Sequence, residues 1–179
     1  NTISNKIDIP QFNENKNIII DPRLAYQITS MMEGVIKRGT AKKLKELDTP
    51  IAGKTGTTNN NKDAWFIGYT PDLVIGIYVG YDQPKSLGYK QTGSSVAVPI
   101  FKNFAEKIKI NKNKKPFIIP SGISFVRIDP NNGQVSNKKN SISEPFLLGS
   151  EPYTDNIYVI DGLENFNNNS ISGTGGLLK

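Results

Sequence analysis

Three short β-compatible segments follow one another between residues 51 and 81, with only a few turn residues between them. Residues 51–58, 64–69 and 73–81 combine β-branched, aromatic and small side chains, as strands do. Residues 59–63 and 70–72 supply Asn, Asp, Thr and Pro, which are typical of turns. Because such short connections join antiparallel neighbours, the pattern predicts a three-stranded antiparallel meander.

A helix is predicted on each side of this meander. Asp21 followed by Pro22 is a typical helix start, and apolar residues then recur at helical spacing to Ile36. This predicts a helix over residues 22–38, which Gly39 ends. A second helix is predicted over residues 94–109, with Pro99 near enough to its start to be tolerated. Residues 41–47 form a basic connector that allows one more helical turn. The fold class is therefore α+β, an antiparallel β-meander flanked by helices.

The rest of the chain is polar and predicts little core. Residues 123–128 favour a strand, and the Asp-Pro-Asn-Asn-Gly segment at 129–133 favours its turn. That segment is faintly similar to a calcium loop, but Asn140 stands where the closing Glu belongs, so we prefer a hairpin turn. The predicted division is a linker or loop at 1–20, a folded portion at 21–110, and an extension at 111–179 with a β-hairpin and a flexible tail.

Composition excludes several kinds of chemistry. The 179 residues contain no His and no Cys, which rules out Ser-His-Asp and Cys-His catalysis, His or thiolate metal sites, and disulfides. Any enzymatic chemistry must then use Ser, Thr, Lys, Asp, Glu or Tyr. The net charge of +6 is modest and comes mainly from Lys, so it gives no signal for nucleic-acid binding. We expect no metal and no cofactor.

A Lys-Thr-Gly-Thr-Thr motif at residues 54–58 falls on the first predicted strand and belongs to a wider pattern. The pattern comprises Ala-Gly-Lys-Thr-Gly-Thr-Thr at 52–58, Asp-Ala-Trp-Phe-Ile-Gly-Tyr-Thr-Pro at 63–71, Gly-Tyr-Asp at 80–82 and Glu-Gly-Val-Ile-Lys-Arg-Gly-Thr at 33–40. Together these segments resemble the transpeptidase domain of class A penicillin-binding proteins over residues 21–104, and more weakly to about residue 146. The resemblance implies a serine β-lactamase/penicillin-binding-protein-like fold, with residues 21–110 as the C-terminal portion of the transpeptidase domain.

The resemblance also implies an acyl-serine mechanism. In this family the Ser of a Ser-x-x-Lys motif attacks the D-Ala-D-Ala peptide of a peptidoglycan stem, a Ser-x-Asn motif assists, and Lys-Thr-Gly forms the third wall of the site. Residue by residue, Lys54 and Thr57 would be catalytic, and Thr55, Gly56, Thr57 and Thr58 would bind substrate. The implied partners are the stem peptide, β-lactams and the remainder of the parent transpeptidase.

Each motif position has a physical reason. Lys54 would supply a fixed positive charge beside the nucleophile. The hydroxyls of Thr55 and Thr57 project toward one face of a strand, where they can bind the terminal carboxylate of the stem peptide or of a β-lactam. Gly56 lets substrate backbone lie along the strand edge, and the Thr57 backbone N–H would form one arm of the oxyanion hole. Thr58 would shape the rim.

A simpler interpretation remains open for the same residues. Lys54 can be an ordinary solvated strand lysine, and the threonines ordinary β-formers. Trp65 and Phe66 are both expected to pack in the core beneath the motif strand rather than to stack on substrate.

The serine motifs of the family do not occur upstream of Lys54, and no Ser-x-Asn occurs anywhere in the chain. The one Ser-x-x-Lys match, Ser136-Asn-Lys-Lys139, follows the motif in a lysine-rich segment, and we treat it as chance. The chain begins with Asn1 and shows no signal-peptide pattern, so we expect it to be a piece of a longer protein. Alone it should be catalytically inactive and should expose a sheet edge and an apolar face.

Three hypotheses remain at this point. The chain is the C-terminal portion of a class A peptidoglycan DD-transpeptidase; or it belongs to a class B transpeptidase or a serine β-lactamase; or it is a non-catalytic remnant that serves as a binding or structural module. The Thr57-Thr58 pair and the Asp-Ala-Trp-Phe run favour class A. The first hypothesis implies a location on the outer, periplasmic face of the bacterial cytoplasmic membrane, with the membrane reached only through an anchor absent from this chain.

Overall fold

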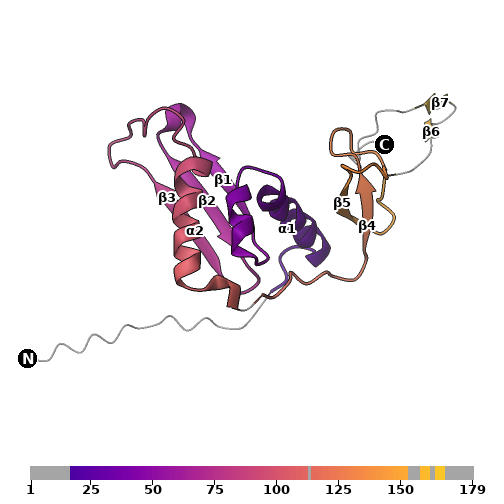
Figure 1. Ribbon diagram of the computed structural model, residues 1–179. Helices are drawn as coiled ribbons and strands as arrows, with labels where there is room; N and C mark the ends of the chain where they lie inside the picture. Colours follow the sequence, from indigo (N-terminus) through magenta and orange to yellow (C-terminus); the bar gives the residue numbers. More distant parts are fainter. Residues whose placement is uncertain (1–16, 113, 153–157, 162–163, 168–179) are drawn as a thin grey trace, which may run out of the picture.

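The computed structural model describes residues 17–112, 114–152, 158–161 and 164–167. Figure 1 shows a helix-and-sheet body followed along the chain by a β-hairpin. The helices and strands of the described residues are α1 (Pro22–Lys37), η1 (Lys42–Leu47), β1 (Ala52–Thr57), η2 (Asn59–Asn61), β2 (Ala64–Tyr69), β3 (Val74–Val79), η3 (Gly93–Ala97), α2 (Val98–Lys107), η4 (Ile110–Lys112), β4 (Ile123–Ile128), β5 (Ile142–Leu147), β6 (Tyr158–Asp161) and β7 (Glu164–Asn167).

Helix α1 begins where the sequence predicts. The Asp21 carboxylate accepts a hydrogen bond from the backbone N–H of Arg23 at 2.8 Å, and Pro22 occupies the first turn. The Arg23 guanidinium also donates to Asp21 and lowers the pKa of that carboxyl to about 2. At the other end, the N–H of Arg38 donates to the carbonyl of Gly34 at 2.8 Å. The helix predicted over residues 22–38 is thus confirmed.

The predicted meander is also confirmed. Strand β2 pairs antiparallel with β1 and with β3, which gives the order β1-β2-β3. In the register, Thr55 lies opposite Phe66 and Thr57 opposite Ala64. Strand β1 is consequently an edge strand, and no other described strand pairs with its outer side.

The second predicted helix is present but starts with an irregular turn. Residues Gly93–Ala97 form the π-helical turn η3, which continues into α2. Thr92 caps this start, since its backbone N–H donates to the Ser95 hydroxyl at 2.8 Å and its own side chain accepts from the Ser95 N–H. Pro99 lies in the first turn of α2, directly after the π-helical turn.

The hydrophobic core lies between α2, η1 and one face of the sheet. Phe66 of β2 and Phe101 of α2 are fully buried, and their rings meet edge to face with centroids 4.9 Å apart. The other buried members of this cluster are Ile36, Ala41, Leu44, Leu47, Ile51, Ile75, Ala97, Val98 and Ala105. Burial of these side chains is the main force that holds α2 against the sheet.

The expected burial of Trp65 is wrong. Successive strand residues point to opposite faces, so the core position of its neighbour Phe66 places Trp65 on the other face, where it is 41% exposed. There its ring contacts Tyr78 of β3, with centroids 4.6 Å apart. The prediction of core packing holds for Phe66 only.

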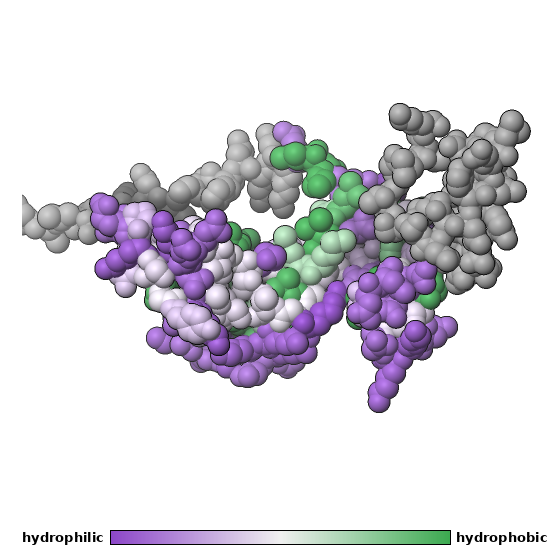
Figure 2. Space-filling view, turned by 90° about the horizontal axis from the view of Figure 1, so that it is seen from above, coloured by the Kyte–Doolittle hydropathy of each residue, from purple (hydrophilic) through white to green (hydrophobic). Residues whose placement is uncertain are grey.

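An apolar face is left exposed in the described part of the chain. Figure 2 shows hydrophobic surface gathered inside a hollow on one side, while the other side is largely hydrophilic. The large exposed hydrophobic side chains on α1, β2 and β3 include Leu24, Ile28, Met31, Trp65, Ile67, Val74 and Tyr78. The exposed edge and apolar face expected from the sequence are therefore both present.

The hairpin of β4 and β5 packs on α1. Strand β4 matches the predicted 123–128 strand and pairs antiparallel with β5. Gln27 donates to the Pro145 carbonyl at 3.0 Å, Arg38 forms an ion pair with Glu144, and the Tyr26 and Phe125 rings meet edge to face. Strand β5 is the second strand of the predicted hairpin, but its position was not predicted, because its Pro and polar residues conceal the apolar pattern.

The 129–133 segment forms the predicted turn. The Asp129 carboxylate accepts from the N–H of Asn131 at 2.9 Å, and Gly133 adopts a positive φ of 73°. These are local turn contacts, as expected for a hairpin rather than for a calcium loop. The division of the chain at 20 and 110 stays a prediction, and most of its linker (residues 1–16) and the end of its tail (168–179) lie outside the described residues.

No helix in the described ranges has both the length and the hydrophobicity that a membrane crossing requires. Likewise, no cluster of three or more acidic side chains in these ranges is placed to hold a metal ion.

Candidate functional site

The Lys-Thr-Gly-Thr motif occupies most of the edge strand β1. Just after the strand, the N–H of Thr58 donates to the carbonyl of Asp63 at 3.2 Å, so Thr58 faces β2. Backbone groups alternate in direction along an antiparallel strand, which turns the N–H groups of Thr57 and Thr55 away from β2. The Thr57 amide therefore points to the open edge of the sheet.

Lys54 is exposed and lies on the same face of the sheet as Gly56. Its ammonium donates to the Thr55 carbonyl at 3.0 Å, which agrees with that carbonyl facing the open edge. Among the described residues, no carboxylate lies within salt-bridge distance of Lys54. The charge is thus available at the edge where a ligand would lie.

Thr55 and Thr57 share one face of β1, and each hydroxyl has a partner from another part of the chain. The Thr55 hydroxyl lies 2.8 Å from the hydroxyl of Thr40, which follows α1. The Thr57 hydroxyl accepts a hydrogen bond from the Gly93 N–H at 3.0 Å. These contacts join the motif strand to the ends of both flanking helices. The sequence pattern missed them because they link residues far apart in the chain.

Gly56 has a structural reason to be glycine besides the access it gives to a ligand. It lies opposite Trp65, and a Cβ at position 56 would come 3.2 Å from the Trp65 Cβ. Gly93 is still more restricted, since a Cβ there would come 2.6 Å from the Gly56 carbonyl oxygen. The start of η3 thus lies directly against the centre of the motif strand.

Thr58 takes part in a network at the end of β1. Its hydroxyl accepts from the Asp63 N–H at 2.8 Å and donates to the Asp63 carboxylate at 3.1 Å. The Tyr78 hydroxyl donates to the other carboxylate oxygen at 3.0 Å, and this bond raises the pKa of Tyr78 above its ordinary value. The network ties β1, β2 and β3 together beside Thr57, and it satisfies the Thr58 hydroxyl within the protein.

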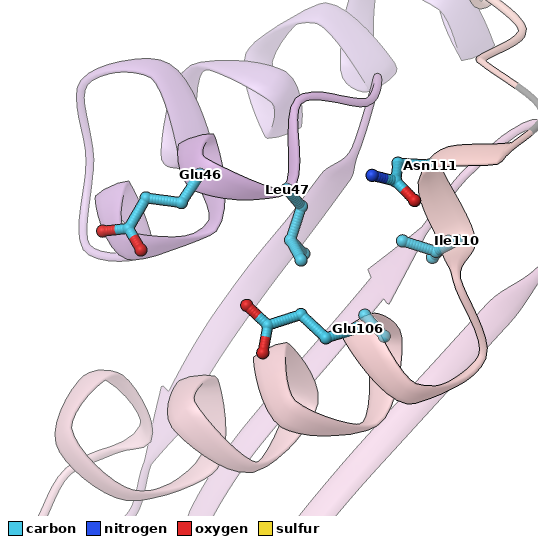
Figure 3. Close-up of a pocket in the computed structure, with 6 residues that line it drawn as sticks. Glu46, Leu47, Glu106, Ile110 and Asn111 are labelled. Atoms are coloured by element: carbon cyan, nitrogen blue, oxygen red, sulfur yellow. The ribbon is translucent and has the colours of Figure 1, made fainter.

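Two cavities in the described part of the chain are formed by residues outside the motif. One of about 200 Å³ is lined by Glu46 and Leu47 of η1, Ala105 and Glu106 of α2, and Ile110 and Asn111 of η4 (Figure 3). A second, of about 510 Å³, is lined by residues of α1, η1 and the segment before β1. Neither cavity takes a residue from β1.

The Ser-x-x-Lys match at 136–139 lies in the β4–β5 loop. The N–H of Ser136 donates to the Arg127 carbonyl at 2.9 Å, and its hydroxyl accepts from the Lys138 N–H at 3.3 Å. The Lys138 ammonium lies 3.9 Å from the Asp129 carboxylate. These are contacts of a surface loop, which agrees with treating the match as chance.

Comparisons with known proteins agree on one family. Residues 3–106 match the family model described as penicillin binding protein transpeptidase domain. The chain is 40% identical over 176 residues to Penicillin-binding protein 1A of Rickettsia bellii, covering 96% of the chain and 21% of that protein. It is 46% identical over 117 residues to Penicillin-binding protein 1A of Pseudomonas aeruginosa, covering 65% of the chain and 14% of the relative.

A solved structure gives the same result for the fold. A crystal structure of Penicillin-Binding Protein 1A from Haemophilus influenzae matches this chain with a TM-score of 0.66 and 30% sequence identity. The match covers 75% of this chain and 21% of the chain in that crystal structure. The chain thus spans about a fifth of the length of the Rickettsia bellii relative and of the Haemophilus influenzae structure. The sequence match and the shared fold show that the chain belongs to the penicillin-binding protein transpeptidase domain family.

Proposed function

We propose that this chain is the C-terminal portion of a class A peptidoglycan DD-transpeptidase domain, and that β1 is one wall of its acyl-serine site. The observation that carries the proposal is that the Lys-Thr-Gly-Thr motif of this family member lies on the open edge strand of the sheet. Lys54 has no carboxylate partner among the described residues, and the Thr57 amide points to a sheet edge that no described strand covers.

The proposed roles follow from this geometry. Lys54 stabilises anionic groups beside the nucleophile, and the hydroxyls of Thr55 and Thr57 bind the substrate carboxylate. Gly56 lets the peptide lie along β1 as an added strand. The Thr57 amide donates to the oxyanion that forms on the attacked carbonyl. Thr58 acts through the turn network, which fixes the end of the strand.

The reaction divides into two steps. A serine hydroxyl adds to the carbonyl carbon of the D-Ala-D-Ala bond, its proton passes through a neighbouring base to the leaving amine, and the C–N bond breaks to give an acyl-serine ester. An amine of a second stem peptide then attacks the ester carbonyl, the ester C–O bond breaks, and the amine proton passes through the base to the serine oxygen, which restores the serine hydroxyl. The serine and its Ser-x-x-Lys lysine come from sequence outside these 179 residues.

The exposed apolar face supports a partner in the same protein. Several large hydrophobic side chains of α1, β2 and β3 are exposed, and no described strand pairs with the outer edges of β1 and β3. We assign this face to the remainder of the transpeptidase, which also brings the serine to β1. Peptidoglycan stem peptides and β-lactams are the proposed ligands.

The proposed location is the outer face of the bacterial cytoplasmic membrane. The net charge of +6 favours proximity to anionic lipid and wall polymer. Co-sedimentation with anionic vesicles at low and high salt tests this electrostatic contribution. Binding that salt does not weaken, or no binding at low salt, would contradict it.

The catalytic proposal is tested by intact mass after incubation with a penicillin. The complete transpeptidase should gain one adduct, on a serine outside this chain, whereas the 179-residue chain alone should gain none. No adduct on the complete protein would favour the non-catalytic module, and rapid loss of the adduct by hydrolysis would favour a β-lactamase. An adduct on Ser136 would show that our interpretation of the 136–139 segment is wrong.

A further inference from the structure

Two groups outside β1 hydrogen bond the motif hydroxyls. We propose that Thr40 and the Gly93 amide are positioning groups, which make the hydroxyls of Thr55 and Thr57 into hydrogen-bond donors for a bound carboxylate. The inference rests on the proposed function, in which these two hydroxyls bind the carboxylate of a stem peptide or a penicillin. It adds the residues that give the hydroxyls their direction.

The Gly93 contact leaves the hydroxyl proton of Thr57 free. A backbone amide can only donate, so its bond to the Thr57 oxygen at 3.0 Å uses an acceptor position of that hydroxyl. The single hydroxyl proton is left for another partner. Thr57 therefore presents a donor to an incoming ligand, and a carboxylate accepts from donors only.

The close approach of this amide depends on the missing side chain of Gly93. A Cβ on Gly93 would come 2.6 Å from the Gly56 carbonyl oxygen and closer still to that of Trp65. Real Cβ atoms essentially never come so close, so a larger residue would push η3 away from β1. The N–H of residue 93 would then lose its contact with Thr57.

The Thr40 contact gives Thr55 a similar polarity when a carboxylate binds. The two hydroxyl oxygens lie 2.8 Å apart, and one of the two hydroxyls donates its proton to the other, with either oxygen as donor. A carboxylate near Thr55 selects the arrangement in which Thr40 donates to Thr55, because only then is the Thr55 proton free. Thr40 thereby acts through Thr55 without touching the ligand.

Thr40 is itself held by the turn that carries the Gly93 amide. The Ser94 hydroxyl donates to the Thr40 carbonyl at 2.5 Å. Gly93 and Ser94 therefore connect the start of η3 to β1 and to the segment after α1. Both motif hydroxyls depend on one turn, and this predicts that they are oriented together.

The test compares a penicillin with its carboxyl methyl ester as acylating agents of the complete transpeptidase. With Thr40→Val, the second-order rate constant for the free acid should fall about 3–10-fold, because a charge-assisted hydrogen bond loses its alignment. The rate constant for the neutral ester should change less than about 2-fold, since neutral hydrogen bonds are weaker. The ratio of the two rate constants is a readout that general destabilisation does not change.

Three further variants complete the design. Thr40→Ser restores the hydroxyl and should restore the preference for the free acid. Ser94→Ala should reduce the preference less than Thr40→Val does, because it releases the Thr40 backbone only. Thr49→Val makes the same chemical change three residues before β1 and should leave the preference unchanged.

The possible failures are distinguishable. If the unmodified protein is not acylated by either compound, the proposed function is wrong and this inference with it. If it is acylated and Thr40→Val keeps the full preference for the acid, only the positioning role is wrong. An equal loss with both compounds, or a preference that Thr40→Ser fails to restore, would also overturn the positioning role.

Discussion

The rings of Phe66 and Phe101 meet edge to face in the core, with centroids 4.9 Å apart, and Gly68 leaves the space in which they do so. A Cβ on Gly68 would come 2.6 Å from the Phe66 ring and 2.8 Å from that of Phe101. Both rings are fully buried and have nowhere to move without displacing α2. The contact between α2 and the sheet thus requires glycine at position 68, because any side chain there would meet both rings.

Gly68→Ala should consequently destabilise the protein, by about 1–3 kcal/mol, as overpacking of a core typically does. The matched control is Gly76→Ala on the neighbouring strand, where a Cβ meets nothing within 4 Å. That change should be neutral or slightly stabilising, because Ala restricts the unfolded chain more than Gly does. Denaturant unfolding of both variants measures the difference, and equal stabilities would contradict the packing argument.

A second prediction concerns acid and the start of α1. The Arg23 side chain hydrogen bonds Asp21 and lowers the pKa of that carboxyl from 3.8 to about 2. A carboxyl with a lowered pKa in the folded state stabilises the fold above its unfolded pKa. The stabilisation is lost as the pH falls through the folded value. The Asp21 contribution should therefore be complete above about pH 4 and disappear toward pH 2.

Asp21→Asn isolates this charge, since Asn also caps helices. The difference in unfolding midpoint between the original protein and the variant should be larger at pH 5 than at pH 2. A difference independent of pH would show that the carboxylate charge contributes nothing to α1.

The elements with local signals were predictable from sequence. Asp21 and Pro22 set the start of α1 through contacts within three residues, and the short turns between the strands leave only antiparallel pairing. The motif strand was placed correctly for the same reason. The strand pairing shows that the motif strand lies at the edge of the sheet, and the register shows which of its N–H and C=O groups face away from β2.

Features that depend on distant contacts were not predictable. Trp65 and Phe66 are both large and apolar, so the sequence does not show which one faces the core. The packing of α2 decides between them. The contacts of Thr40 and Gly93 with the motif hydroxyls join residues 15 and 36 positions apart, and no periodicity carries that information. The pairing of β5 is likewise concealed by Pro145, which the sheet tolerates at a strand edge.

The third prediction tests the charge of Lys54 in the complete transpeptidase. Lys54→Met removes the ammonium at the open edge and should lower the rate of penicillin acylation by about 100-fold or more, as loss of a preorganised electrostatic group does. Lys54→Arg keeps the charge but changes its geometry, and should retain part of the rate. Lys62→Met, in the turn after β1, is the matched control and should have little effect. If Lys54→Met and Lys62→Met react equally fast, Lys54 is only a solvated strand lysine.

The last prediction separates the two groups that Thr57 offers. Thr57→Val removes the hydroxyl and keeps the backbone N–H, so penicillin acylation should slow by about 3–10-fold through loss of one hydrogen bond.

Thr57→Pro removes the N–H as well. Because that N–H faces away from β2, the change breaks no bond of the β1–β2 ladder, and an edge strand tolerates proline there. The additional loss in Thr57→Pro relative to Thr57→Val should be about 100-fold, the usual effect of one oxyanion donor. Equal rates for the two variants, measured on proteins with similar unfolding midpoints, would exclude the Thr57 amide from the oxyanion hole.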